Sequence, residues 1–229
     1  MTYVMSDIHG CYDKYTEMLE KIGFSEDDSL YVLGDICDRG PDSAKIYLDM
    51  MKRSNVFPIK GNHEKMAEPY LGNLFLSDGK INRAGLEELN ALIWIENGGD
   101  ATIVSLMNCS EEDRNRVTGY IKKMPYYRTV TVGDTEYVLV HAGLENFHPD
   151  KPLEEYTVSE LVWESPDFDY CFFGGEKKRL LVGHTPTPLI AGESVIYVGK
   201  GDVIALDCGA VFGKRLGCLC LDTMEEFYV

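Results

Sequence analysis

Three polar motifs recur at nearly equal intervals in the first part of the chain, and each follows a short apolar run. Asp7 and Asp35 are 28 residues apart, and Asn62 follows 27 residues later. The preceding runs, 3–5, 30–33 and 56–59, have the length and composition of buried strands. Intervals near 30 residues are typical of βαβ units, whose parallel strands end at one edge of a sheet. We therefore expect an α/β fold in which the three motifs meet in one cleft.

The stretches between and after these runs divide the chain further. Between the first two runs, Tyr15, Met18, Leu19 and Ile22 have the spacing of one helical face. Residues 80–125 break the alternation and predict a helical insertion, with the pair Gly98-Gly99 as a break between helices. We expect this insertion to be structural rather than substrate-specific, and we expect Trp94 and Trp163 to lie in the core. After residue 125 the pattern is mainly β, with a hairpin turn at Gly133-Asp134.

Bulk properties limit the classes of protein that fit. A chain of 229 residues fits a single domain, residues 1–229, that contains the insertion. The net charge of −16 argues against binding of nucleic acid or an anionic membrane surface, because both rely on Lys and Arg. Seven scattered cysteines, no signal-peptide pattern and no long apolar run predict a cytoplasmic protein with reduced thiols.

Four of the five histidines lie in or beside short glycine-containing motifs. Any one of them is more often an ordinary polar residue at the end of a strand, but the whole ordered set favours a metal centre. Oxygen and nitrogen donors of this kind suit manganese, iron or zinc. The candidate metal ligands are Asp7, His9, Asp35, Asn62, His141 and His184.

These ligands divide between two ions. Asp7, His9 and Asp35 are assigned to one ion, and Asp35, Asn62, His141 and His184 to the other, so that Asp35 bridges them. Two divalent cations leave net positive charge on such a set, which would attract a phosphate group. Paired metals also lower the pKa of a shared water and give a bridging hydroxide nucleophile near neutral pH. The pattern therefore predicts hydrolysis of phosphate esters.

Three further residues predict the remaining catalytic parts. His63 follows the ligand Asn62 and is the candidate general acid for the leaving group. Asp38 would hold the His63 ring, and Arg39 offers a planar fork for two phosphate oxygens. Arg39 and Asn62 are the candidate substrate-binding residues. Glu64 either orients the surroundings of His63 or simply begins the next helix, and the second reading is preferred.

Together these motifs resemble the PPP family of calcineurin-like metallophosphoesterases. The segments 161–163 and 206–213 look most like compact bacterial and phage serine/threonine protein phosphatases. The resemblance implies a four-layer α/β/β/α sandwich of mixed sheets and the ligand and catalytic roles given above. It also implies two divalent or trivalent metal ions, typically manganese, iron or zinc, of which manganese is the first candidate here. Relatives usually supply a second phosphate-binding arginine, which is missing after Trp163. Arg179 and Lys177 are the candidate substitutes.

Three functions are compatible with this resemblance. The first is a serine/threonine protein phosphatase acting on a phosphoprotein or a small phosphorylated substrate. The alternative is a symmetrical bis(5'-nucleosyl)-tetraphosphate hydrolase, with Tyr126, Tyr127 and Arg128 as candidate contacts for the adenines, although a role at the edge of a strand is preferred for these three residues. The third, a non-catalytic metal-binding scaffold, is disfavoured because no ligand or catalytic residue is missing from the motifs.

Overall fold

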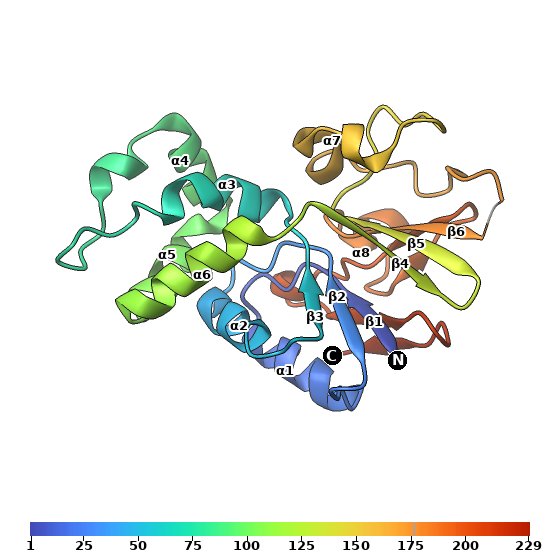
Figure 1. Ribbon diagram of the computed structural model, residues 1–229, viewed down its shortest axis with the longest axis horizontal. Coiled ribbons are helices and arrows are strands. Elements are labelled where there is room, and N and C mark those ends of the chain that lie inside the picture. Colours follow the sequence, from blue (N-terminus) through green and yellow to red (C-terminus); the bar gives the residue numbers. More distant parts are fainter. Residues whose placement is uncertain (176) are drawn as a thin grey trace.

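Two five-stranded sheets form the centre of the computed structural model, which describes residues 1–175 and 177–229 (Figure 1). The strand order of the first sheet is β10-β9-β1-β2-β3. Its strands are β1 (Thr2–Met5), β2 (Ser29–Val32), β3 (Val56–Pro58), β9 (Gly217–Cys220) and β10 (Glu226–Tyr228). The strands β1, β2 and β3 are parallel, and they are joined through helices α1 (Tyr12–Lys21) and α2 (Ser43–Met50). The predicted βαβ units are therefore confirmed.

The second sheet has the order β4-β5-β6-β8-β7 and is also mixed. Its strands are β4 (Tyr127–Val132), β5 (Thr135–Val140), β6 (Lys178–Val182), β7 (Tyr197–Val198) and β8 (Val203–Ala205). The antiparallel pair β4 and β5 turns at Gly133 and Asp134, as the sequence predicted. The strands β5, β6 and β8 run parallel. His141 and His184 follow β5 and β6, so both lie at the carboxyl end of a strand.

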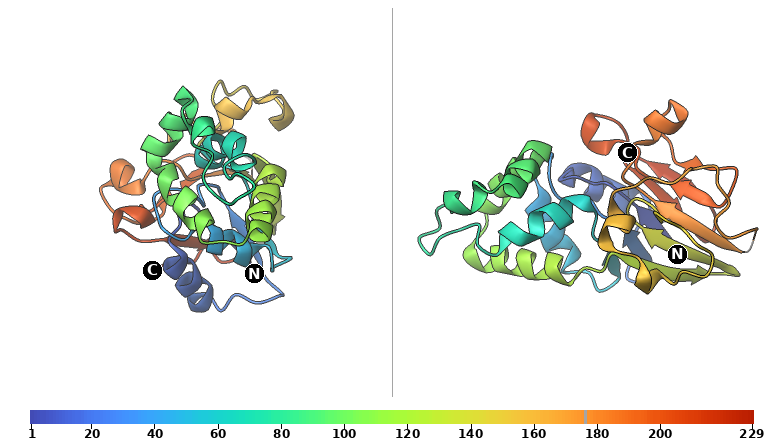
Figure 2. Two further views of the ribbon diagram at one scale, coloured as in Figure 1. Left: turned by 90° about the vertical axis from the view of Figure 1, so that its left-hand side faces the viewer. Right: turned by 90° about the horizontal axis from the view of Figure 1, so that it is seen from above.

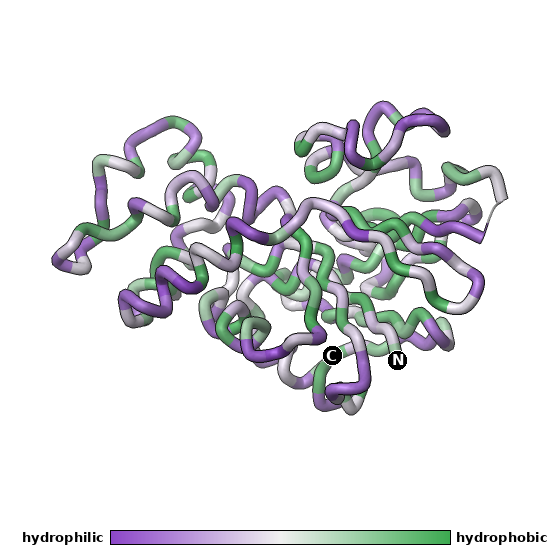
Figure 3. The backbone as a smooth tube through the Cα atoms, in the orientation of Figure 1, coloured by the Kyte–Doolittle hydropathy of each residue, from purple (hydrophilic) through white to green (hydrophobic). Residues whose placement is uncertain are grey.

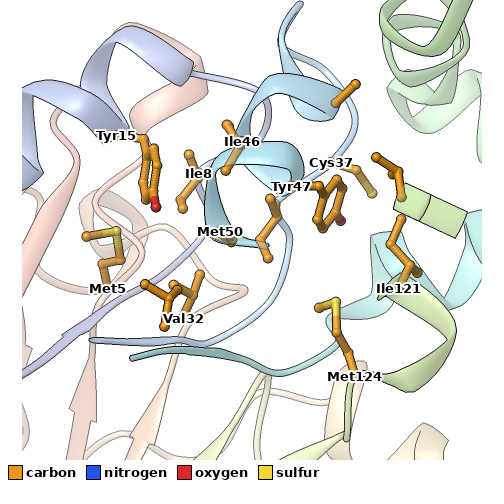
Figure 4. Close-up of a cluster of buried hydrophobic side chains, with 14 of the residues drawn as sticks. Met5, Ile8, Tyr15, Val32, Cys37, Ile46, Tyr47, Met50, Ile121 and Met124 are labelled. Carbon is orange, nitrogen blue, oxygen red and sulfur yellow. The ribbon is translucent and has the colours of Figure 1, made fainter. Parts of the chain in front are cut away.

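Side chains alternate between the two faces of each strand, and this alternation builds the layers. In β1, Val4 belongs to the cluster between the sheets, whereas Tyr3 and Met5 face the helices on the outer side. Figure 4 shows part of that outer cluster, with Tyr15 and Tyr47 packed near the strands. Hydrophobic stretches follow the central strands, while helix α6 (Glu111–Lys123) is largely hydrophilic (Figure 3).

A third apolar cluster packs α7 (Val158–Val162) against the outer face of the second sheet. The order of layers is thus helices, sheet, sheet, helix, and the predicted four-layer α/β/β/α sandwich is confirmed. The short helix α8 (Thr187–Ala191) follows His184. Trp163 was wrongly predicted to be a core residue: it follows α7 directly and its surface is 41% exposed.

Several helices gather at one end of the molecule, beyond the sheets (Figures 1 and 2). They are α3 (Asn62–Leu71), α4 (Leu89–Trp94), α5 (Asp100–Met107) and α6, together with the short helical segments η1 (Arg83–Leu86) and η2 (Ile95–Gly99). The predicted break at Gly98 is present, because this residue has φ 99° inside an otherwise helical stretch. Among the described helices, none combines the length and apolar character needed to cross a membrane.

Candidate metal centre

The candidate ligands lie where the chain leaves the strands, and their backbone is strained there. In the described part of the chain, six of the eight non-glycine residues with positive φ belong to the predicted site. They are Asp7, His9, Asp35, Asp38, Arg39 and His184, with φ between 44° and 69°. Left-handed backbone costs L residues about 1–3 kcal/mol each and persists where the surroundings enforce it, often at functional sites. The loops are therefore held in conformations that direct these side chains inward.

Glycines beside the motifs make room for this convergence. A Cβ at Gly61 would overlap the Asp35 Oδ1 atom and lie 2.8 Å from Cε1 of His141. A Cβ at Gly183 would overlap Asp7 and its neighbour Ser6. The motif glycines are therefore required by the close approach of the loops.

Asp35 stands at the centre of the cluster. Its Oδ2 atom lies 3.3 Å from His141 Nε2, 3.5 Å from His9 Nε2 and 3.9 Å from His63 Nε2. Two groups of donor atoms share it: His9, Asp35 and His63 form one, and Asp35, His141 and His184 form the other. Its position between both groups fits the bridging role expected from the sequence.

Two histidines are oriented by backbone carbonyls. Nδ1 of His9 lies 2.8 Å from the Cys37 carbonyl, and Nδ1 of His141 lies 2.7 Å from the Leu33 carbonyl. A carbonyl oxygen only accepts, so each Nδ1 donates, and each Nε2 offers a lone pair once a metal ion displaces any proton that it carries. Both Nε2 atoms face Asp35. This arrangement is the usual way in which proteins prepare a histidine to bind a metal.

The remaining predicted ligands complete the ring of donors. The Asn62 amide lies 2.8 Å from His141 Nε2 and 3.2 Å from His184 Nδ1. With the amide oxygen facing these nitrogens, three electron-pair donors converge on one point, and a cation bound there would remove the repulsion between them. Asp7 Oδ1 lies 4.0 Å from His9 Nε2, and its Oδ2 accepts from the His184 backbone N–H at 3.0 Å. All six predicted ligands therefore belong to one cluster.

Buried negative charge is concentrated in this cluster. Burial and the neighbouring Asp207 raise the pKa of Asp7 well above its usual range. Burial also raises the pKa of Asp207 to about 6. Burial opposes ionisation of Asp35 and His141 alike, but their mutual attraction outweighs it, so the pKa of Asp35 falls well below its usual range and that of His141 rises to about 10. Several carboxyl groups thus compete for too little positive charge, a situation that bound cations would resolve.

The donor set therefore fits two divalent metal ions. Carboxylate oxygens, imidazole nitrogens and an amide oxygen suit manganese, iron or zinc, and the described cluster contains no thiolate that would favour a softer ion. The expectation of divalent ions agrees with these His and Asp groups, whereas manganese stays a prediction. Bound ions would polarise a phosphoryl group and lower the pKa of water.

The three predicted catalytic residues lie around this centre. Nδ1 of His63 is 2.7 Å from Oδ2 of Asp38, so the ring is held from one side. Its Nε2 is buried, faces Asp35 and has no hydrogen-bond partner among the described residues. The exposed Arg39 places Nη1 2.6 Å from Nε2 of His9, and its guanidinium stacks over the Phe212 ring at 5.4 Å.

Glu64 has a role that the preferred sequence interpretation missed. It lies in the first turn of α3 and is fully buried. Its carboxylate accepts hydrogen bonds from four backbone N–H groups and from one tyrosine hydroxyl. The donors are Asp35 N, Ile36 N, Cys37 N, Gly61 N and Tyr47 Oη, at 2.7–3.2 Å. Glu64 thus holds the Asp35 loop against the start of α3, a contact that residue spacing does not encode.

The helical insertion supplies two further residues that were not predicted. Trp94 Nε1 donates to Oδ2 of Asp38 at 2.9 Å, and Thr102 Oγ1 donates to Oδ1 of the same carboxylate at 2.6 Å. Trp94 was correctly predicted to be buried, but its polar atom was given no role. A buried indole N–H needs an acceptor, which is the one signal that the sequence offered.

The residues considered for the substrate have other packing partners in the structure. Tyr126 and Tyr127 pack against the cluster on the outer face of the second sheet, and the Arg128 guanidinium lies 5.6 Å from the centre of the Phe57 ring. The Tyr126 ring packs under Lys60, with 5.0 Å between Nζ and the ring centroid, and Tyr127 begins β4. Arg179 donates to the Gly201 carbonyl, and Lys177 pairs with an aspartate of the β4–β5 turn at 2.7 Å. Arg179 and Lys177 lie toward the end of β6 that is opposite to His184, so neither replaces the missing arginine.

The chain belongs to the calcineurin-like phosphoesterase family, whose model matches residues 2–215. The expected family and enzyme class, a metallophosphoesterase, are thereby confirmed at the family level. Neighbouring solved structures show the same fold. A protein serine/threonine phosphatase of Saccharomyces cerevisiae aligns with 95% of this chain and 71% of its own, at TM-score 0.62 and 17% identity.

Curated relatives differ in the substrate that their names give. A symmetrical bis(5'-nucleosyl)-tetraphosphatase of Wigglesworthia glossinidia brevipalpis is 30% identical over 71% of this chain and 49% of its own. An asymmetrical bis(5'-nucleosyl)-tetraphosphatase of Bacillus velezensis is 27% identical over 93% of this chain and 86% of its own. Serine/threonine-protein phosphatase 1 of Salmonella typhimurium is 25% identical over 93% and 88%. The chain thus spans about half the length of the symmetrical enzyme.

Proposed function

We propose that this protein hydrolyses bis(5'-nucleosyl) tetraphosphates at its two-metal centre. The sequence motifs alone favoured a protein phosphatase and kept the nucleotide hydrolase as the alternative. The tetraphosphatases named above match this chain at higher identity than the phosphatase does, which supports the alternative. The metal-binding residues are compatible with both substrates, because the bond broken is a phosphorus–oxygen bond in each.

The observation that carries this proposal is a pair of exposed aromatic rings beside the two ends of the cluster. The Trp163 ring centroid lies 6.5 Å from that of His184, and the 58% exposed Phe212 lies under Arg39, which contacts His9. His9 and His184 belong to different donor groups around Asp35. A dinucleoside polyphosphate carries an aromatic base at each end of its phosphate chain. Each ring is therefore a candidate platform for one base.

A cavity extends from Trp163 along one side of the helical end of the molecule. It has a volume of about 680 Å³ and is lined by α3, η1, α4 and Trp163. Lys65, Tyr70 and Asn73 are among the residues that line it. A space of this size is of the order occupied by a small organic ligand. We assign it to one nucleoside of the substrate.

The chain's own residues have distinct tasks in this proposal. Arg39 presents its guanidinium fork to the phosphate oxygens. His63 gives the Nε2 proton to the oxygen that departs, and Asp38 holds the ring through Nδ1. The closed loops around Asp35 exclude all but a small amount of solvent, since every predicted ligand except His184 is buried.

A side-by-side assay tests the proposal. Manganese-loaded protein is given diadenosine tetraphosphate and a phosphothreonine peptide, and kcat/KM is compared. We expect the nucleotide to be preferred at least about a hundredfold, corresponding to roughly 2.7 kcal/mol of transition-state stabilisation. A preference of that size for the peptide would refute the proposal. The products, two diphosphates or a triphosphate with a monophosphate, distinguish symmetrical from asymmetrical cleavage.

The ring of Trp163 gives a sharper test. Trp163→Ala should raise KM for diadenosine tetraphosphate by about tenfold to a hundredfold, because stacking of a base on an aromatic ring is worth about 1–3 kcal/mol. The same variant should leave KM for 4-nitrophenyl phosphate, which has no nucleobase, nearly unchanged. Equal changes for both substrates would remove Trp163 from base binding.

Protein phosphatase activity is the second candidate. The serine/threonine-protein phosphatase named above matches this chain over most of both lengths, unlike the symmetrical tetraphosphatase. The missing second arginine argues for weaker binding of an isolated phosphate group, which is less damaging when nucleobases also bind. The peptide arm of the assay decides between the two.

A further inference from the structure

The buried carboxylate of Asp38 accepts hydrogen bonds from three separate elements. Oδ2 accepts from Trp94 Nε1 at 2.9 Å, and it lies 2.7 Å from Nδ1 of His63. Oδ1 accepts from Thr102 Oγ1 at 2.6 Å. All four side chains are at most 2% exposed, so water does not compete for these bonds. Donors at both oxygens fix the plane and the rotation of the carboxylate.

The Thr102 hydroxyl makes two bonds to the same residue. Besides donating to Oδ1, its oxygen accepts from the backbone N–H of Asp38 at 2.8 Å. A hydroxyl has one proton and two lone pairs, so the donation to Oδ1 uses its single proton. Thr102 therefore holds the backbone and the side chain of Asp38 together.

The break between α4 and α5 supports the same loop. Asp38 and Arg39 both have left-handed backbone, with φ 69° and 67°. The N–H of Arg39 donates to the Gly98 carbonyl at 2.9 Å. A Cβ at Gly98 would lie 2.9 Å from that same nitrogen, and Gly98 itself has φ +99°. The glycine is thus needed both for its own conformation and for its approach to the strained loop.

We propose that Trp94 and Thr102 are positioning residues for proton donation, so that the helical insertion is part of the catalytic apparatus. They act through Asp38, which orients the His63 ring so that Nε2 faces the centre. This inference rests on the role of His63 as proton donor under the proposed function, but it does not depend on which phosphate compound is the substrate. It replaces the expectation that the insertion is only structural.

The proton balance is simple. Water adds to phosphorus, and the bond from phosphorus to the leaving oxygen breaks with its electron pair on that oxygen. The leaving oxygen takes the proton from His63 Nε2, and the proton lost by water restores the ring. A tilted ring would delay this transfer, and the delay matters most for a poor leaving group such as phenolate.

Thr102→Val tests the inference with little change in volume. With manganese-loaded protein, we expect kcat for phenyl phosphate to fall about tenfold more than kcat for 4-nitrophenyl phosphate, while both KM values stay within about twofold. Thr102→Ser keeps the hydroxyl and should restore phenyl phosphate turnover. Trp94→Phe, which removes the other donor, should show the same selective loss.

Ser105→Ala is the matched control. Ser105 is also a buried hydroxyl residue of α5, but its oxygen accepts from the Ala44 backbone N–H and does not touch Asp38. Its loss should affect the two aryl phosphates equally. If Thr102→Val also lowered both equally, or if Ser105→Ala showed the same selectivity, the inference would be overturned.

An NMR measurement on the metal-free protein gives a second readout. The Nδ1 proton of His63, held by Asp38, should give a downfield signal that shifts or exchanges faster in Thr102→Val and stays unchanged in Ser105→Ala. An unchanged signal in Thr102→Val would overturn the inference even if no aryl phosphate were hydrolysed. Selective loss on phenyl phosphate without hydrolysis of diadenosine tetraphosphate would refute the proposed function and leave this inference standing.

Discussion

Replacing Glu64 with glutamine should destabilise the protein severely although it keeps the shape of the side chain. In the native protein Oε1 accepts from Ile36 N, Cys37 N and Tyr47 Oη, and Oε2 accepts from Asp35 N and Gly61 N. An amide has only one oxygen. In the most favourable orientation the glutamine oxygen takes the place of Oε1 and keeps its three hydrogen bonds. The NH₂ group then faces the N–H groups of Asp35 and Gly61, which are left without an acceptor.

The size of the effect follows from those two donors. A buried N–H group left without an acceptor costs about 1–3 kcal/mol, so Glu64→Gln should lower the free energy of unfolding by about 2–6 kcal/mol. That is a large part of the roughly 5–15 kcal/mol that stabilises a typical domain. Urea unfolding followed by circular dichroism, with the m-value checked, measures the difference.

Tyr47→Phe is the control, because it removes one donor and leaves the carboxylate intact. It should cost about 1.5 kcal/mol, the lower range for a hydrogen bond to a charged group. A loss below about 1 kcal/mol for Glu64→Gln, or a loss no larger than that of Tyr47→Phe, would refute the view that Glu64 holds the Asp35 loop.

Three other predictions concern the motif glycine, the phosphate clamp and the response to acid. Gly61→Ala places a methyl group against Asp35 and His141 and should weaken manganese binding at least about tenfold. The control is Gly119→Ala in α6, which should leave manganese binding unchanged, because the space around Gly119 is open and alanine favours a helix. Equal manganese affinities of the two variants in a titration would contradict the steric argument. Arg39→Lys should raise KM for 4-nitrophenyl phosphate about tenfold, because an ammonium cannot form the paired contact of a guanidinium, and an unchanged KM would remove Arg39 from phosphate binding. Hydrogen bonds from Lys151 and Thr157 lower the pKa of Glu160 to about 2, below the unfolded value of about 4.3. Its stabilisation is therefore full above about pH 4.3 and is lost as pH falls toward 2, so the difference in Tm between wild type and Glu160→Gln should shrink over that range; a constant difference would contradict the assignment.

The first sheet, and the edge of it where the motifs lie, could be predicted because both depend on the regular spacing of apolar and polar residues along the chain. Apolar runs followed by polar residues at βαβ intervals predict parallel strands that end together, and β1, β2 and β3 do so. The motif at each strand end therefore identified the residues that converge around Asp35. Physical spacing and donor chemistry were sufficient for that part of the site.

The supporting contacts could not be predicted, because they join residues far apart in the chain. Thr102 lies 64 positions from Asp38, and Trp94 lies 56 positions from it. No periodicity relates residues at such distances. A glutamate in the first turn of a helix is common whether or not its carboxylate also accepts hydrogen bonds from a loop. The prediction that Glu64 simply begins the helix was therefore incomplete.

The prediction that Trp163 lies in the core was wrong for a related reason. Trp163 follows an apolar pair, Leu161 and Val162, and those two residues are buried. The helix α7 ends at Val162, so the next side chain turns away from the core and lies beside His184. The end of a helix cannot be predicted from sequence to within a residue or two, and here a difference of one residue places the Trp163 side chain beside the metal centre instead of in the core.

The central claim is that six side chains from distant motifs form one two-metal centre that shares Asp35. Equilibrium dialysis against manganese, followed by elemental analysis, measures it directly in the wild type and in Asp35→Asn. The account predicts two bound ions per chain in the wild type and weakened binding at both sites in the variant. A wild-type chain that binds one ion or none, or an Asp35→Asn chain that still binds two with unchanged affinity, would contradict it.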